Sequence, residues 1–452
     1  MELKLIKGTD NAREILDRAD LLDMSALPES VAARTRELFG EDVTPEQSVV
    51  RMLKEVREEG DVAVRRYAKL LDGADLNDFL VEPKEMRQAL EGIPKELRES
   101  LELAAQRVTD FHRAVMPRSW VDLEKGLGEM VRPLAIVGLY APGGTAAYPS
   151  TVIMTAVPAR VAGVSQVIMA TPRRGEEPLN SAVLAAAQIA GVDAVYQVGG
   201  VPAIGAMAYG TQSIPKVDKI CGPGNVFVSY AKKLVQGQVD IDGIFGPTET
   251  IVIADDSANP SFCAADLIAQ AEHDTMATAI LVTDSESLVR RIEKALDVQL
   301  DKQERRDIAE NSLKNQGRVV LVESIGQAIE LGNTLAPEHM CLMVKDPWAW
   351  AGKVENAGGL FLGEFSPEVM GDYIAGPSHV MPTGGTARFS SALSVHQFLR
   401  TMPVVGLSPQ DFSGLGPAAV HIAHAEGLGA HAGAIQVRLN SLADRFSPWV
   451  QI

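Results

Sequence analysis

Apolar side chains recur along the chain with two different spacings, and the spacing changes near Pro133. Between about residues 45 and 115 they recur at helical intervals with charges between them, as in QSVVRMLKEVREEGDVAVRRYAKLL. From Pro133 onward, short apolar runs of the strand type alternate with helical stretches, beginning with LAIVGLYAP, STVIMTAVPARVAGV and QVIMATP. Such alternation predicts a parallel sheet with helices on both faces.

A second series of the same kind follows a break rich in Gly and Pro at IDGIFGPTE. Its predicted strands are TIVIADDS, TAILVTDS, GRVVLVES, MCLMVKDP and GGLFLGE, with helical stretches between them. The sequence therefore predicts an α/β protein with two tandem Rossmann-like parallel-sheet domains, an N-terminal helical segment and a helical C-terminal tail. We expect an N-terminal arm over 1–34, a first α/β domain built from 35–139 and 248–393, a second over 140–247, and the tail over 394–452. The tail has too little apolar surface to fold alone, so we expect it to pack on a partner subunit.

Length, charge and cysteine content narrow the class of protein. At 452 residues the chain is too long to fold around a single hydrophobic core of ordinary size, so more than one domain is expected. Its 42 Lys and Arg against 59 Asp and Glu give a formal charge of −17, which argues against nucleic acid or a membrane as the main partner. The first residues lack the apolar core of a secretory signal, and no apolar run is long enough to span a bilayer. Cys221, Cys263 and Cys341 lie far apart, which predicts reduced, buried thiols and a cytoplasmic protein.

Seven of the eight histidines lie beyond residue 270, and two neighbourhoods there carry candidate chemistry. Gln270 and His273 share one face of a predicted helix. An amide oxygen beside an imidazole nitrogen suits zinc, although polar pairs at this spacing are commonplace. Glu338 and His339 are adjacent, before an apolar strand. They suit an acid and a base, or equally a helix terminus at which a cationic His interacts with the dipole.

Two further neighbourhoods lie nearer the C-terminus. Asp372 precedes GPSHVMPTGG, which is typical of a shaped binding loop or simply of a turn. Glu426 and His431 lie in the predicted tail. Two nitrogen and two oxygen donors, a set acceptable for zinc that spacing alone does not prove, come from Gln270, His273, Asp372 and His431.

A glycine-rich turn is the candidate phosphate site. Ala141-Pro142-Gly143-Gly144 follows a predicted strand and precedes a helix, where a cofactor phosphate can meet backbone N–H groups. No G-x-G-x-x-G occurs in either half of the chain, so the standard dinucleotide fingerprint is absent.

Several motifs, in one order along the chain, resemble histidinol dehydrogenase: YAPGG, VDKICGPGN, GPTE, QAEHD, APEH, GDYIAGPSHVMPTGGTARFSS and AEGLGAH. The resemblance covers nearly the whole chain after about residue 30. It implies oxidation of L-histidinol through histidinaldehyde to L-histidine with two NAD, the last steps of histidine biosynthesis. It also implies a homodimer in which the tail crosses to the partner subunit.

The resemblance further implies roles for individual residues. His339 would be the base for the hydroxyl proton, and Glu338 would activate water for the second oxidation. One Zn²⁺ per subunit would be held by Gln270, His273, Asp372 and His431. The substrate would contact Thr248, Gln270, His273, His339, Asp372, Glu426 and His431. NAD would contact Tyr140 and Asn225, and His379 would line the pocket.

Two departures and three alternatives qualify this interpretation. Pro202 stands where many relatives have a glutamine that contacts NAD, so it receives no such role, and Thr248 replaces a serine. The nearest alternative is a paralogous zinc- and NAD-dependent dehydrogenase of another alcohol, such as a sulfonated diol, but Glu426 suits a cationic amine. A zinc hydrolase would leave the two sheets unexplained. A non-catalytic binding protein would be expected to have lost Glu338, His339 or a metal ligand, and none is lost.

Overall fold

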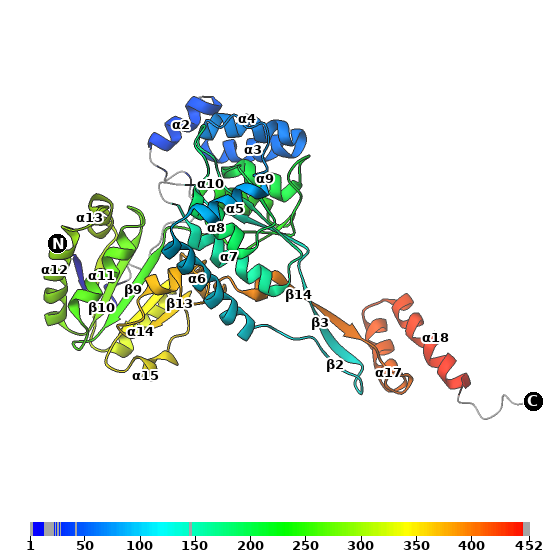
Figure 1. The fold of residues 1–452 in the computed structure, drawn as a ribbon. Helices are drawn as coiled ribbons and strands as arrows, with labels where there is room; N and C mark the ends of the chain where they lie inside the picture. The colour runs from blue at the N-terminus through cyan, green and yellow to red at the C-terminus, as the bar shows by residue number, and fades with distance from the viewer. Residues whose placement is uncertain are drawn as a thin grey trace, which may run out of the picture. The chain divides into compact units, whose positions relative to one another are not determined.

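The computed structural model confirms the predicted α/β class (Figure 1). It describes residues 3–12, 22, 24, 27, 29–40, 43–143 and 147–445. Gly144 of the predicted phosphate-binding turn and much of the predicted arm therefore lie outside the described residues. The chain divides into two compact units, the first formed by 1–116 and 134–398 and the second by 117–133 and 399–452.

The first unit contains a six-stranded sheet in which every neighbouring pair is parallel. Its strands, in spatial order, are β1 (Lys4–Lys7), β11 (Arg318–Leu321), β10 (Thr278–Thr283), β9 (Glu249–Ala254), β12 (His339–Met343) and β13 (Gly359–Leu362). Its helices are α11 (Pro260–Ala271), α12 (Glu286–Leu300), α13 (Arg306–Asn315), α14 (Ile325–Leu335), α15 (Pro347–Ala351) and α16 (Glu368–Tyr373). The chain reverses its direction of strand addition between β9 and β12, which makes the sheet doubly wound.

Alternate residues of these strands enter different cores. Val252 and Cys341 pack with α11, α12 and α13, whereas Ile251 and Met340 pack with α14 on the other face. Because side chains alternate along a strand, Thr250 and His339 face the same side as Val252 and Cys341. The polar groups of Thr250 and His339 therefore lie on the face of the sheet that α11 covers.

The second sheet, also in the first unit, has five parallel strands. In spatial order they are β6 (Ala194–Tyr196), β5 (Gln166–Ala170), β4 (Ile136–Tyr140), β7 (Lys219–Cys221) and β8 (Asp240–Ile241). Its helices are α7 (Pro149–Ala162), α8 (Ser181–Ala190), α9 (Gly200–Tyr209) and α10 (Val226–Val235). The direction of strand addition reverses between β4 and β7, so the second sheet is doubly wound as well.

The predicted assignment of 35–139 to the domain of 248–393 is wrong. This segment contains α2 (Glu29–Phe39), α3 (Pro45–Glu59), α4 (Asp61–Asp72), α5 (Pro83–Gly92) and α6 (Lys95–Ala114). α3 contacts α9 and α10, α5 contacts α8, and α6 contacts α7, so these helices pack around the five-stranded sheet. Helical periodicity predicts an apolar stripe but does not identify the surface that covers it.

Two other predicted boundaries also differ from the structure. The N-terminal arm supplies β1 to the edge of the six-stranded sheet. The tail is not purely helical, because β14 (Leu399–Val405) pairs antiparallel with β3 (Leu127–Pro133), which pairs with β2 (Trp120–Asp122). This three-stranded sheet and the helical pair α17 (Pro409–Ala425) and α18 (Gly429–Arg445) make up the described part of the second unit; two short 3-10 helices, Thr386–Arg388 and Val395–Phe398, lie in the first.

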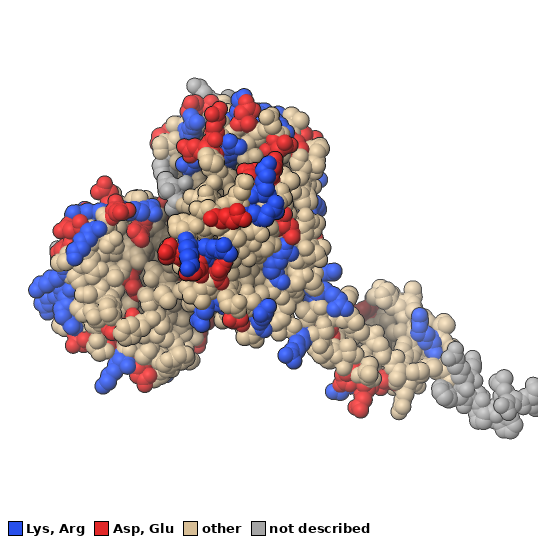
Figure 2. Space-filling view, in the orientation of Figure 1, with Lys and Arg blue, Asp and Glu red and all other residues tan. Residues whose placement is uncertain are grey.

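Burial and charge agree with the composition. The three cysteines are free and buried, as predicted. On the face drawn in Figure 2, acidic and basic side chains are interspersed rather than separated into patches of one sign. Within the described residues, no helix combines the length and the apolar character needed to cross a membrane.

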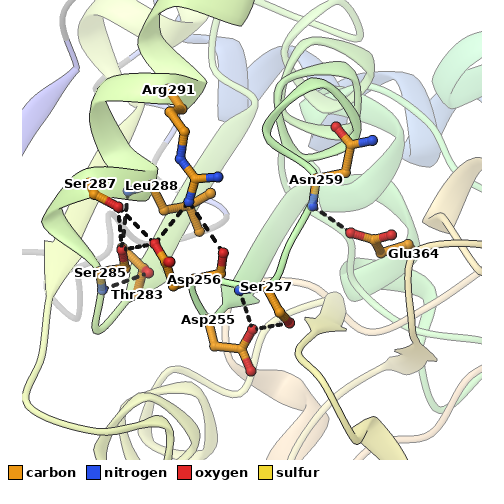
Figure 3. A network of polar contacts seen from close by, with 10 residues as sticks. All are labelled: Asp255, Asp256, Ser257, Asn259, Thr283, Ser285, Ser287, Leu288, Arg291 and Glu364. Carbon is orange, nitrogen blue, oxygen red and sulfur yellow. Dashed lines mark hydrogen bonds and ion pairs between the residues drawn. The ribbon is translucent and has the colours of Figure 1, made fainter.

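A polar network fastens the carboxyl edge of the six-stranded sheet (Figure 3). Asp256 accepts hydrogen bonds from the hydroxyls of Ser285 at 2.6 Å and Ser287 at 2.7 Å, and it pairs with Arg291 at 2.8 Å. Asp255 accepts from the backbone N–H of Lys345 at 2.9 Å. These contacts tie together the turns that follow β9, β10 and β12. The acid–base pair predicted from sequence lies at the opposite, amino edge.

Candidate active site

The amino ends of β9 and β12 bring Thr248 and Glu338 together. The Thr248 hydroxyl donates to Glu338 Oε2 at 2.6 Å, and the backbone N–H of Glu249 donates to the same oxygen at 3.2 Å. The two strands are adjacent and parallel, so residues at their starts meet at one edge. Ligands usually gather at the carboxyl ends of such strands, and this pair departs from that rule.

The Glu338 carboxyl is buried and tends to hold its proton. Burial raises its pKa to about 8, and the carboxylates of Glu249 and Asp372 add to the rise. The hydrogen bond from Thr248 opposes it. A carboxyl group tuned in this way changes protonation state near neutral pH, which suits general acid–base chemistry.

The neighbouring His339 is neutral for the same physical reason. Burial lowers its pKa to about 3, and the nearby His273 and His379 lower it further. Its Nδ1 lies 3.2 Å from Thr250 Oγ1 and 3.6 Å from Glu368 Oε2. Its Nε2 is buried and has no hydrogen-bond partner among the described residues. The unengaged ring nitrogen has a lone pair that can take a proton, and burial makes the resulting imidazolium a short-lived, high-energy species.

Three of the four predicted zinc ligands lie in the first unit. Gln270 is in the last turn of α11, which ends at Ala271, so His273 lies just beyond the helix and not on it as predicted. Asp372 is on α16, where burial raises its pKa to about 6. The Gln270 side chain is fully buried, and its amide nitrogen finds no partner within the described part of the chain. An amide oxygen, an imidazole and a carboxylate are donors that zinc accepts, so these residues fit a metal.

The other predicted ligand, His431, lies on α18, and Glu426 ends α17. Both are exposed and belong to the second unit. Among the described residues, no group of three or more His, Cys, Asp or Glu is placed to hold a metal ion. Of the predicted ligands, His273 and Asp372 are residues of those types in the first unit, whereas Gln270 would bind through an amide and His431 belongs to the second unit.

His379 supports the backbone that carries Asp372. Its Nδ1 lies 2.8 Å from the backbone oxygen of Asp372, and its Nε2 lies 3.2 Å from the Thr151 hydroxyl. Burial lowers its pKa to about 4, so the ring is neutral. With both ring nitrogens engaged, His379 joins α7 to the end of α16.

The two residues predicted to contact NAD line one cavity of about 620 Å³ at the reversal between β4 and β7. Tyr140, at the end of β4, accepts a hydrogen bond through its hydroxyl from the backbone N–H of Gly200 at 3.0 Å. Asn225 caps α10 by accepting from the N–H of Val228 at 3.1 Å. In doubly wound sheets this crevice is the usual nucleotide site. Pro202 is buried in the first turn of α9, where a missing N–H costs little.

Sequence reasoning missed two buried polar residues, Thr250 and Glu368. Both touch His339, and the Thr250 hydroxyl also bonds Glu368. A signal was present for each: Thr250 lies two residues after Thr248, on the same side of a strand, and Glu368 lies four residues before Asp372. Neither spacing is distinctive without the contacts.

Two doubly wound parallel sheets, with a buried carboxyl–imidazole pair at one and a nucleotide-sized cavity at the other, define an α/β enzyme. Residues 37–439 match the family model described as histidinol dehydrogenase. The chain belongs to the histidinol dehydrogenase family and is an oxidoreductase.

Similar proteins support this assignment over almost the full length. The histidinol dehydrogenase of Dehalococcoides mccartyi (strain CBDB1) is 46% identical over 438 residues, which cover 97% of this chain and 100% of the relative. That of Aquifex aeolicus (strain VF5) is 48% identical over 399 residues, covering 87% and 92%. The crystal structure of histidinol dehydrogenase from Elizabethkingia anophelis matches with a TM-score of 0.89 at 33% identity, covering 98% of this chain and 99% of that one.

Proposed function

We propose that this protein oxidises L-histidinol to L-histidine through histidinaldehyde, in two successive transfers of hydride to NAD, with one Zn²⁺ per subunit. The observation that carries the proposal is the buried pair of consecutive residues Glu338 and His339, whose pKa values burial shifts in opposite directions, so that both tend to be neutral. Membership of the family supplies the substrate.

His339 performs the first proton transfer. Its unengaged Nε2 takes the proton of the histidinol hydroxyl group, while a hydride leaves the carbon that bears this hydroxyl. The resulting imidazolium lies beside Glu368, whose Oε2 is 3.6 Å from Nδ1. NAD, when bound, would accept the hydride. Gln270, His273 and Asp372, with His431 of a tail, would hold the zinc, which would supply a Lewis acid to bind and orient the substrate.

Glu338 performs the second proton transfer. Once ionised, it accepts a proton from the water that adds to the aldehyde, and the Thr248 hydroxyl holds the carboxylate in place at 2.6 Å. The aldehyde hydrate then loses the second hydride to a second NAD. Retaining the aldehyde in a buried site between the two steps prevents its escape.

Other parts of the molecule support the proposed cofactor, the proposed partner subunit and the proposed location. The cavity that contains Tyr140 and Asn225 is the proposed NAD site. The second unit leaves large apolar side chains exposed, such as Leu123 at 89% and Ile422 at 62%, which supports burial against a second copy of the chain. We propose a homodimer in which each tail brings Glu426 and His431 to the other subunit. The three buried free thiols support a cytoplasmic location.

The deciding experiment measures NADH formed by the purified protein with L-histidinol, before and after removal of metal and after return of zinc. Two NADH per histidinol, lost on stripping and restored by zinc, are the expected result. No NADH from folded, zinc-loaded protein would overturn the proposed substrate. A screen of other amino and sulfonated alcohols would then test the paralogous dehydrogenase.

A further inference from the structure

The Thr250 hydroxyl stands at the centre of the candidate active site. Thr250 is the second residue of β9, is 1% exposed, and is the register partner of His339 on β12. Its Oγ1 lies 3.0 Å from Gln270 Oε1 and 3.2 Å from His339 Nδ1, and it makes a short hydrogen bond to Glu368 Oε2. A single oxygen atom therefore touches the predicted base, a predicted zinc ligand and a buried carboxylate.

A hydroxyl group has one proton and two lone pairs, so Thr250 donates to only one of these three neighbours. Glu368 is 2% exposed, and its Oε2 needs a donor whether the carboxyl group is ionised or carries its proton on Oε1. Burial raises the pKa of Glu368 well above its usual value, and the hydrogen bond from Thr250 opposes the rise. If the proton goes to Glu368, the hydroxyl oxygen must accept from both His339 and Gln270.

The first acceptance determines the tautomer of His339. A neutral imidazole carries one N–H, and Nδ1 must bear it in order to donate to Thr250. The lone pair then lies on Nε2, the buried ring nitrogen without a partner among the described residues. The nitrogen left over is thus the one that can act as a base.

The second acceptance determines the orientation of the Gln270 amide. To donate to Thr250, the amide must present its nitrogen, and its oxygen then occupies the buried position where no partner is found among the described residues. The oxygen and the NH₂ group of an amide are nearly the same size, so the Gln270 amide can rotate by half a turn without needing extra space. An oxygen at that position has a lone pair for a cation, whereas an NH₂ group has none.

The opposite arrangement, in which Thr250 donates to Gln270, leaves a buried polar group without a hydrogen bond. If Thr250 donated to the Gln270 oxygen, Glu368 would have to carry its proton on Oε2 and donate it to Thr250, and the Gln270 NH₂ would be buried without an acceptor. A buried polar group without its hydrogen bond costs about 1–3 kcal/mol. It would also turn a donor toward the place where a metal ligand is required.

We propose that Thr250, by giving its proton to Glu368, positions both the base His339 and the metal ligand Gln270. This inference rests on the proposed zinc- and NAD-dependent function and deepens it. Thr250 and Glu368 act through other residues and are positioning residues. Removing one hydroxyl group is therefore expected to damage metal binding and proton transfer together.

Two matched pairs of full-length proteins isolate the hydroxyl. Thr250→Val exchanges the hydroxyl of the wild type for a methyl group, and Thr250→Ala removes the hydroxyl of Thr250→Ser. Zinc affinity is measured by competition with a chelator. The tautomer of His339 is read from the NMR shift of ¹³C-labelled histidine Cδ2, assigned with His339→Asn. The kcat and KM for histidinol are measured on the same preparations.

We expect zinc affinity to fall about 10-fold or more in each hydroxyl-free protein, as for other groups that orient metal ligands. We also expect His339 to lose the pure Nδ1–H tautomer and kcat to fall more than KM changes. Thr250→Ser should match the wild type. Equal zinc affinity and an unchanged tautomer in both pairs would overturn the inference.

The readouts also separate this inference from the proposed function. Zinc affinity and tautomer require no turnover, so a wild type that binds zinc but does not oxidise histidinol contradicts the substrate and leaves the test of Thr250 valid. If Thr250→Val fails to fold, judged by circular dichroism, the Ser and Ala pair decides.

Discussion

At the scale of single residues, Glu338 and His339 show how one environment serves two opposite purposes. Burial disfavours charge, so it raises the pKa of the carboxyl and lowers that of the imidazole. The two side chains then turn to different neighbours, Glu338 to Thr248 and His339 to Thr250. The resting pair is uncharged: His339 becomes charged when it takes a proton from the substrate, whereas Glu338 must first lose its own proton before it can accept one from water.

Replacing Glu338 with Gln should separate the two oxidations, because the amide cannot accept the proton of water. We expect the first hydride transfer to persist and histidine formation to fall about 100-fold, within the range for loss of a general base. In the wild type the aldehyde step should quicken as pH rises through about 8, since Glu338 works only after losing its proton, and the variant should lack this rise. Rapid-quench single turnovers at several pH values measure both steps.

His339→Asn provides the contrast, since it should abolish the first NADH. Two NADH per histidinol from Glu338→Gln, with the wild-type pH profile, would show that the carboxyl is not the base for water.

At the scale of elements, the turn after β7 shows how closely two strands must approach to form the proposed cofactor cavity. Gly222 has φ +117°, and a Cβ there would lie 2.2 Å from the backbone oxygen of Tyr140. Its N–H donates to Asp242 at 2.6 Å, and its carbonyl accepts from Lys232 at 3.1 Å. Lys232 and Asp242 also form a buried ion pair with each other, so the two side chains that bind the Gly222 backbone are themselves fixed.

Gly222→Ala should therefore lower the free energy of unfolding by at least about 2 kcal/mol and weaken NAD binding. Both the strained φ and the clash contribute. Gly237→Ala is the matched control, because Gly237 has φ +95° and a Cβ added there would have no atom within 4 Å. Denaturant unfolding and NAD titration of the two variants test the prediction; equal losses in both would remove the clash from the explanation.

Local pattern predicted most strands and helices, and the misses have physical causes. β14 contains Pro403, which usually argues against a strand, but it lies at a sheet edge where a missing N–H is tolerated. β1 has four residues, too few for a periodic signal. The roles of Thr250 and Glu368 depend on side chains from four different elements, and spacing along the chain does not contain that information.

At the scale of the whole molecule, the second unit has a very small core of its own. Among its described residues, Val420, Ala423 and Ala432 form the buried cluster, with Ile435 and Leu439 against it. An element with so little buried apolar surface needs a further surface to cover it. Exchange of tails in a homodimer would supply that surface and deliver His431 to the other site.

Mixing two inactive proteins tests the exchange. Glu338→Gln damages the first unit and His431→Asn the tail, so neither homodimer should form histidine at the wild-type rate. If tails cross, a mixed dimer contains one site with an intact first unit and an intact tail. Refolding the two together should then restore about a quarter of wild-type activity. No gain over the separate proteins would mean that each tail serves its own subunit.

The pairing of β1 with β11 has a consequence for how the protein is made. Lys4–Lys7 are synthesised long before their hydrogen-bonding partners, Arg318–Leu321. Until those partners are made, β1 cannot pair as it does in the folded protein, and pairings this distant in sequence form slowly. The order of synthesis and the order of assembly thus differ at this edge of the sheet. A nascent chain that stalls before Arg318 carries its first strand without a partner, exposed to any other strand edge in its surroundings.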